Sequence, residues 1–454
     1  MRFHRSAALA VVASAALTVS LTSAASAAEA VPIETRGELP GGGRYVVYEP
    51  LSWNGTLLTW NPGYGGGGPA ASAGPSAEAV AWLTEQGYAV AGVSAGSGWA
   101  VEDLLAAGPQ VVEVVEDKLG DAEHVIAWGA SMGGQVSVAL MEQSPDVFDA
   151  ALPLCGSIAG GIPMLNAALD GTYALKTLVA PDDERLELVD VSDEGARQAA
   201  FREVLDSAQQ TPEGRARIAL AATLAQMPTW SQVGTEKPAR NDIATQQDQL
   251  YRIFLWGVVS PRQPLEQRAG GNFSWNTGVD YADALRESGG TTLVRKLYRE
   301  AGISLDDDLA ALNAGDRIAA DRDAVAYMQQ NATPTGAISG PVLSIHETGD
   351  AAPVVQQAAT YAERVKQNGA GRDLLAQTFV DRPGHCAYAD AEIAALVTAM
   401  QQRLDTGSWR NFANPHQLNK TADAVTAADG LERGGEFTRE NPDEMVRSER
   451  EPDL

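Results

Sequence analysis

The stretch WGASMGGQ contains the pattern G-x-S-x-G, with Gly129 and Gly133 on either side of Ser131. This spacing is typical of a nucleophilic serine on a sharp turn between a strand and a helix, where small neighbours let the backbone fold without clashes. The residues before the serine form an apolar run typical of a strand, and those after it have a helical pattern. We therefore predict that Ser131 is a nucleophile. The backbone N–H groups at the start of its helix, beginning with Met132, are expected to bind an oxyanion.

A nucleophilic serine needs a general base, and the chain contains five histidines. Four of them lie in unsuitable places, namely an N-terminal leader, the start of the strand before the serine, an apolar strand and a polar tail (His4, His124, His346 and His416). His385, in DRPGHCAY, instead lies in a Gly-Pro loop just after a strand. From there it can reach across the carboxyl edge of a sheet, so we predict that His385 is the base.

The third member of such a triad is a carboxylate that orients the imidazole. Asp350 ends the strand-like segment PVLSIHETGD, which gives the chain order Ser131, Asp350, His385. Asp381 is the rival because it lies only four residues before His385, and Glu347 is a weaker third choice. Position at a strand end favours Asp350.

The glycine-rich stretch NPGYGGGGP (61–69) follows an early strand and is expected to supply the second half of an oxyanion hole. Tyr64 is the favoured backbone donor, with Gly65 next, and a merely flexible loop is the alternative. The same stretch also contains G-x-G-x-x-G, a pattern that is typical of dinucleotide-binding loops. A dinucleotide site is rejected because the next strand ends in Ser94 instead of an acidic residue, and no phosphate-loop GK[ST] follows.

The chain has two cysteines, Cys155 and Cys386. Cys155 ends the strand that comes after the helix following Ser131, and Cys386 directly follows His385. Both cysteines are therefore expected at the same edge of the sheet. We predict a disulfide between them, worth roughly 5 kcal/mol at most on the chain-entropy model. A nucleophilic Cys386 is disfavoured since adjacent side chains diverge, and the sequence lacks C-x-x-C, H-x-x-x-H and H-E-x-x-H, so no metal site is predicted.

Strand-like and helix-like segments alternate before and after a long helical stretch that contains Trp230, Trp256 and Trp275. This alternation predicts an α/β class with a mostly parallel central sheet and a large helical cap inserted between core strands. The cap tryptophans either line an acyl pocket or simply pack the lid. The expected parts are a signal peptide (1–28), a core (29–157 and 340–408), the cap (158–339) and a polar C-terminal tail (409–454) that wraps the surface or frays.

The leader has a basic start, an apolar run and small residues around Ala27 and Ala28, so we expect cleavage after one of these two alanines and secretion. The chain has 59 acidic against 33 basic residues, a net charge of −26. That balance disfavours nucleic acid and anionic membranes as partners, and no stable membrane anchor is expected.

The quoted segments together resemble the esterase and lipase members of the α/β-hydrolase superfamily, over residues 44–160 and 338–405. WNGTLLTWNPGYGGGG, WGASMGGQ, VLSIHETGD and RPGHC are similar to the oxyanion loop, nucleophile elbow, acid loop and histidine loop of that family. The resemblance implies the α/β-hydrolase fold and hydrolysis of a small-molecule or polymeric carboxylic ester without a cofactor. Two departures are Pro62 where many relatives have histidine, and Ala130, where tannases and feruloyl esterases with a similar GHC segment have cysteine.

Two other functions stay open. A secreted serine peptidase or aminopeptidase of the same fold would use the same triad, and its cap would need a carboxylate to bind the substrate's α-amine. A catalytically inactive binding protein of this fold would usually lack a triad member, whereas all three candidates are present here. The sequence leaves the oligomeric state undetermined.

Overall fold

The computed structural model describes residues 33–66, 68 and 70–447, so the predicted signal peptide lies outside the described residues. Its core is a sheet of nine strands in the order β1-β2-β4-β3-β5-β6-β7-β8-β9. The strands are β1 (Ile33–Glu38), β2 (Arg44–Glu49), β3 (Thr56–Asn61), β4 (Ala89–Ser94), β5 (His124–Ala130), β6 (Ala150–Leu154), β7 (Val342–Gly349), β8 (Leu375–Pro383) and β9 (Phe437–Thr438). Strands β3 to β8 are parallel to one another, whereas β2 and β9 run antiparallel to their neighbours. This is the mostly parallel sheet that the sequence predicts.

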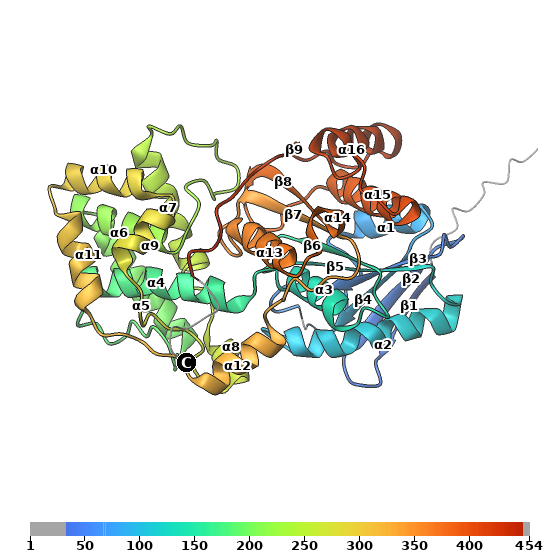
Figure 1. Cartoon of the computed structure of the whole chain (residues 1–454), viewed down its shortest axis with the longest axis horizontal. Helices are drawn as coiled ribbons and strands as arrows, with labels where there is room; N and C mark the ends of the chain where they lie inside the picture. The colour runs from blue at the N-terminus through green and yellow to red at the C-terminus, as the bar shows by residue number, and fades with distance from the viewer. Residues whose placement is uncertain (1–32, 67, 69, 448–454) are drawn as a thin grey trace, which may run out of the picture. The chain divides into compact units, whose positions relative to one another are not determined.

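Helices cover both faces of the sheet (Figure 1). The core helices are α1 (Ala77–Glu85), α2 (Val101–Leu119), α3 (Met132–Gln143), α13 (Gln356–Gln367), the short α14 (Gly371–Leu374), α15 (Asp390–Thr406) and α16 (Pro415–Asp429). Because both faces are covered, β3 and β4 are buried along their whole length, and most of their residues are apolar or small.

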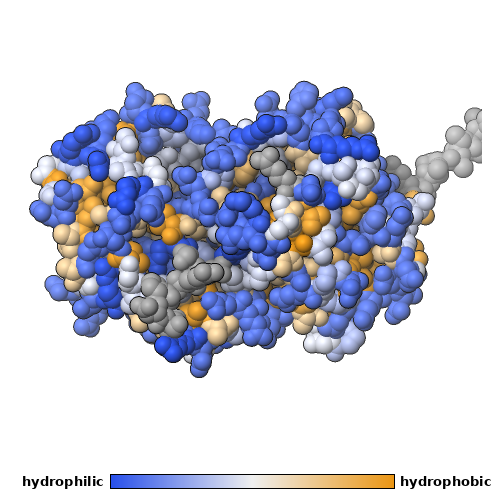
Figure 2. All heavy atoms as spheres, in the orientation of Figure 1, coloured by the Kyte–Doolittle hydropathy of each residue, from blue (hydrophilic) through white to orange (hydrophobic). Residues whose placement is uncertain are grey.

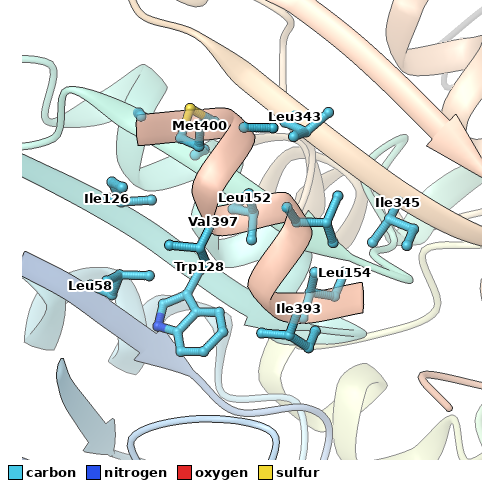
Figure 3. Packing of buried hydrophobic residues seen from close by; sticks show 14 of the residues in the cluster. Leu58, Ile126, Trp128, Leu152, Leu154, Leu343, Ile345, Ile393, Val397 and Met400 are labelled. Atoms are coloured by element: carbon cyan, nitrogen blue, oxygen red, sulfur yellow. The ribbon is translucent and has the colours of Figure 1, made fainter. Parts of the chain in front are cut away.

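One hydrophobic cluster joins α15 to the central strands. Figure 3 shows Ile393, Val397 and Met400 of α15 packed against strand residues that include Trp128 and Leu152. A second cluster lies on the opposite face, under α2 and α3. Each large apolar side chain buried in this way contributes about 1.5–3 kcal/mol, so the two clusters fix the strand ends on which the functional side chains lie.

The chain between β6 and β7 forms the cap, and helices joined by loops are its regular elements, as predicted. Its helices are α4 (Gly161–Val179), α5 (Glu194–Ala208), α6 (Pro212–Leu224), α7 (Ile243–Gly257), α8 (Gln263–Ala269), α9 (Tyr281–Glu287), α10 (Thr291–Ala301), α11 (Leu305–Ala314) and α12 (Arg322–Asn331). Aliphatic and aromatic residues of α4 to α7 and of α9 to α11 form a core of their own. The chain therefore has an α/β-hydrolase fold, with a large helical cap inserted between core strands.

The C-terminal tail is more structured than the sequence suggests. Helix α16 packs on α15, β9 adds an edge strand to the sheet, and the segment that follows β9 runs to the cap. The sequence predicts from the polar composition that this tail wraps the surface or frays. The described part, which ends at Arg447, lies largely at the surface and is held by a few buried side chains, such as Leu418 and Ala422 in α16.

Hydrophilic residues dominate the face seen in Figure 2, in keeping with the acidic composition. Within the described ranges, none of the helices combines the length and the apolar character needed to cross a membrane.

Candidate active site

Ser131 lies on the predicted sharp turn between β5 and α3. Its backbone has φ 59° and ψ −122°, a conformation that L-residues seldom adopt, and its N–H donates to the carbonyl of Leu154 at 2.9 Å. A Cβ added to Gly133 would come within 1.9 Å of the Asn61 carbonyl oxygen, and one on Gly129 within 2.5 Å of the same atom. Both glycines of the motif are therefore required by the close approach of β3.

The loops after β7 and β8 bring Asp350 and His385 together. His385 Nδ1 lies 2.7 Å from Asp350 Oδ2, while Asp350 Oδ1 accepts from the N–H of Ala352 at 2.9 Å. Asp350 is fully buried. Burial favours the neutral imidazole, but the charge of Asp350 and the hydrogen bond to it outweigh burial and raise the pKa of His385.

Ser131 and His385 line one cavity of about 670 Å³, at the carboxyl edge of the sheet and under the cap. On the core side it is lined by Gly63, Tyr64, Trp99, Ala130, Ser131, Ser157, Ala352, Pro353, His385 and Cys386. On the cap side it is lined by Met164, Leu165, Gln198, Arg202, Leu255, Trp256, Gly257, Ser260, Pro261 and Leu265. The structure thus brings the three predicted triad residues to one place, with Asp350 behind the histidine.

The two rival carboxylates are engaged elsewhere. Asp381 accepts from Lys237 at 2.6 Å and from the Thr348 hydroxyl at 2.8 Å. Glu347 is buried and accepts from the N–H of Ala387 at 2.6 Å. Neither has a hydrogen bond to His385 among the described contacts, whereas Asp350 has one.

Glu347 nevertheless holds the histidine loop. Besides Ala387, its carboxyl contacts the hydroxyl of Tyr388 at 2.5 Å. Burial, followed by the nearby charge of Asp350, raises the pKa of Glu347 to about 8. The sequence pointed to Glu347 only as a possible triad member, and its position inside a strand gave no sign of this supporting contact.

His346, which the sequence places in an apolar strand, is buried in β7 and has a hydrogen-bond partner. Its Nε2 lies 2.6 Å from the carbonyl oxygen of Pro353, and burial lowers its pKa. The neutral ring can therefore donate to that carbonyl and brace the loop that carries Asp350.

The glycine-rich loop after β3 lies against the serine. A Cβ added to Gly63 would lie 3.4 Å from Ser131 Cβ and 4.0 Å from its Oγ. The N–H of Gly65 donates to the Gly98 carbonyl at 3.1 Å, which removes the runner-up oxyanion donor. Tyr64 follows Gly63 and lines the cavity, and Met132 follows Ser131 and starts α3, so both stay the predicted N–H donors.

Cys155 and Cys386 form the predicted disulfide, with Cα atoms 5.4 Å apart. It ties the end of β6 to the histidine loop, and Cys386 Sγ lies 3.4 Å from His385 Nε2. The ligand atoms of Cys155, His385 and Cys386 lie within 4.8 Å of one another. Since the sulfur atoms of Cys155 and Cys386 are bonded to each other, neither is a thiolate that could bind a metal ion.

One cap tryptophan belongs to the site. The ring of Trp256, at the end of α7, packs edge-on to His385 with centroids 5.4 Å apart, and half of the residue is exposed. Trp275, by contrast, is buried in packing, and Trp230 donates to the Thr235 carbonyl. The sequence named all three without separating them, because only the cap's tertiary fold decides which one reaches the cavity.

Comparisons with known sequences relate the chain to one family model and one characterised protein. The prolyl oligopeptidase family (peptidase S9) matches residues 86–160, which include the serine turn. The chain is 30% identical over 429 residues to o-phthalyl amidase of Xanthobacter agilis, covering 86% of this chain and 91% of that protein.

Comparison with solved structures matches feruloyl esterase B from Aspergillus oryzae, at 16% identity and TM-score 0.37, covering 83% of this chain and 80% of that one. Another is acylaminoacyl peptidase from Pyrococcus horikoshii, at 12% identity and TM-score 0.36, covering 89% of this chain and 43% of that one.

Proposed function

Since the chain belongs to the serine hydrolases of the α/β-hydrolase superfamily, in one family with o-phthalyl amidase, we propose that it cleaves carboxylic esters and amides through an acyl-enzyme on Ser131. The sequence pattern supports esters as substrates, and the name of the relative supports amides. A nucleophilic serine can attack the carbonyl carbon of either group, so one site can cleave both kinds of bond.

In the proposed reaction, His385 Nε2 takes the proton of Ser131 Oγ as that oxygen bonds to the acyl carbon. His385 then gives the proton to the leaving alcohol or amine, whose bond to the acyl carbon breaks. Water attacks the acyl-enzyme, losing a proton to His385, and the acid leaves as the proton returns to Ser131. Asp350 holds the imidazole through Nδ1, and the N–H groups of Met132 and Tyr64 stabilise the oxyanion.

The observation that carries this proposal is the 2.7 Å contact between His385 and Asp350 beside a serine held at positive φ. Packing alone does not call for this combination, because the strained serine backbone and the buried carboxylate both cost stability. The same arrangement argues against an inactive binding protein.

The cavity favours an aromatic substrate group. Tyr64 and Trp99 lie on the core side with ring centroids 6.4 Å apart, and Trp256 lies on the cap side. A flat ring in the acyl or leaving group would pack between these faces.

A peptidase is the second candidate because the prolyl oligopeptidase family matches the serine region. An aminopeptidase needs a carboxylate to bind the substrate's α-amine, yet no Asp or Glu lines the cavity in the part of the chain that the structure describes. We therefore favour acyl substrates without a free amine.

The test compares wild-type protein with Ser131→Ala on 4-nitrophenyl esters, benzoyl 4-nitroanilide and aminoacyl 4-nitroanilides. We expect the wild type to hydrolyse the first two classes faster than the third, and Ser131→Ala to lose about 10⁴-fold or more in kcat. Ser207→Ala, an exposed serine on α5, is the matched control. Full activity of Ser131→Ala would contradict the proposal.

We also propose that the protein is secreted, which the disulfide supports because such bonds persist in oxidising compartments. N-terminal sequencing of the exported protein should start at residue 28 or 29.

A further inference from the structure

We infer that Trp256 forms the leaving-group subsite and selects substrates whose leaving alcohol or amine carries an aromatic ring. The inference rests on the proposed function, because Trp256 lines the same cavity as Ser131. It goes further by dividing that cavity into an acyl side and a leaving-group side, and by naming the residue that sets the specificity of the second.

The order of the strands gives the serine two different surroundings. Ser131 follows β5, which lies between β3 and β6 in the sheet. The loops after β3 and β4 lie on one side of it and carry Tyr64 and Trp99. The loops after β7 and β8 lie on the other side and carry Asp350 and His385. A carbonyl group bound at the serine therefore has the oxyanion loop on one side and the histidine on the other.

The chemistry assigns the leaving group to the histidine side. In the proposed reaction, His385 Nε2 gives its proton to the leaving oxygen or nitrogen, so that atom must come within about 2.6–3.2 Å of the imidazole. The acyl substituent diverges from the leaving atom at the tetrahedral carbon. It is therefore directed toward the side of Tyr64 and Trp99.

Trp256 is the large side chain that a leaving group on the histidine side would meet. Its ring lies edge-on to the imidazole of His385, with centroids 5.4 Å apart and an interplanar angle of 61°. It is also one of the few large apolar side chains that the described chain leaves exposed. A ring joined to the leaving atom through one carbon can pack on the indole, and this contact would remove apolar surface of both rings from water.

The residues next to this wall suit an uncharged ring. Leu255 precedes Trp256 on α7, and Ala352 and Pro353 follow Asp350 in the loop after β7. All three line the cavity, and none has a charged side chain or a side-chain hydrogen-bond donor. Apolar contact should therefore decide the affinity for the leaving group, and the flat indole should favour an aromatic ring over a saturated one.

The test uses the benzyl, cyclohexylmethyl and methyl esters of benzoic acid. All three leave as simple alkoxides, so they differ mainly in the ring that they carry. We expect the wild type to have its highest kcat/KM on the benzyl ester. In Trp256→Ala, the ratio of kcat/KM for the benzyl ester to that for the methyl ester should fall about tenfold.

Two variants serve as controls for this ratio. Trp256→Phe keeps an aromatic face and should keep much of the preference for the benzyl ester. Leu51→Ala also removes an exposed apolar side chain, but Leu51 precedes β3 and so lies at the opposite edge of the sheet from the serine. This variant should keep the whole preference.

A second series keeps the benzyl group and varies the acid, as benzoate or acetate. The ratio of kcat/KM for these two esters should be the same in Trp256→Ala as in the wild type, because the acyl group lies on the other side of Ser131. If Trp256→Ala changes this ratio and leaves the first one unchanged, the ring that packs on Trp256 belongs to the acyl group, and the inference is overturned.

Two further results would overturn it. One is equal kcat/KM for the benzyl and cyclohexylmethyl esters in the wild type. The other is an equal loss on all esters in Trp256→Ala, since Trp256 would then only support the imidazole. Both leave the proposed function intact. If the wild type hydrolyses none of the esters, the proposed function fails, and calorimetry with benzyl alcohol decides the subsite. Binding to the wild type that weakens in Trp256→Ala supports it, and equal or absent binding refutes it.

Discussion

Glu347 and Asp350 lie close together behind His385 and have different partners. Asp350 contacts the imidazole, whereas Glu347 contacts the Tyr388 hydroxyl, which also lies 3.2 Å from the carbonyl oxygen of Ile345. That carbonyl can only accept, so when Tyr388 donates to it, the short contact to Glu347 needs a proton on the carboxyl. The raised pKa of Glu347, about 8, agrees with a neutral acid that holds the histidine loop.

A neutral Glu347 makes stability depend on pH. Its pKa rises from 4.5 to about 8 on folding, so the stabilisation is full below 4.5 and is lost as pH rises through 8. The amide in Glu347→Gln keeps a hydrogen-bond donor and an acceptor but does not titrate. The melting temperature of this variant should therefore fall less steeply between pH 5 and 8 than that of the wild type. Its activity at pH 7 should be retained. Glu347→Ala should lose activity. Equal slopes for the wild type and Glu347→Gln would show that Glu347 is ionised in the folded protein.

His385 must be neutral to act as the base, and its pKa is raised, chiefly because Asp350 outweighs the opposing effect of burial. In the pH profile of kcat/KM, the apparent pKa on the acidic side should therefore be higher than the usual imidazole pKa of about 6.5. Asp350→Asn should lower this apparent pKa and reduce kcat by up to about 10⁴-fold. An unchanged apparent pKa in that variant would mean that Asp350 does not face the titrating histidine.

At the scale of the elements, strand ends position the site, and much of that placement could be predicted. The turn at Ser131 and the loops of Asp350 and His385 follow from local patterns, since parallel strands bring their carboxyl ends to one edge. Trp256 against His385 could not be predicted in this way, nor could the structured tail. Those contacts join segments that are distant in sequence and depend on how the cap folds.

The disulfide is the covalent link between two of these strand ends. Because it fixes the loop of His385 to the end of β6, Cys155→Ala/Cys386→Ala should lower both kcat and melting temperature. Labelling of Ser131 by a fluorophosphonate should persist at a lower rate. Reductant should have the same effect on wild type, and free thiols in the native protein would contradict the assignment.

Across the whole described chain, the segment that ends at Arg447 connects core and cap (Figure 1). The N–H of Met445 donates to Thr360 of α13 at 2.8 Å, in the core. Arg447 is buried in the cap, where it pairs with Asp170 at 2.6 Å and donates to the Trp275 carbonyl at 2.5 Å. This strap therefore links the two parts in addition to the chain crossings at each end of the cap and to contacts such as the Lys237–Asp381 ion pair.

Arg447→Ala should destabilise the protein by about 3–5 kcal/mol, because it leaves Asp170 buried without its partner. Asp170→Ala/Arg447→Ala should cost less than the sum of the single changes, measured by denaturant unfolding. Additive losses would show that the pair does not anchor the strap.

In the proposed reaction, Ser131 carries the acyl group during turnover. The most direct measurement is intact-mass spectrometry of the protein quenched during turnover of 4-nitrophenyl benzoate, followed by peptide mapping. We predict one benzoyl adduct per chain, located on Ser131 and absent from Ser131→Ala. Turnover without an adduct, or with an adduct on another residue, would contradict the account.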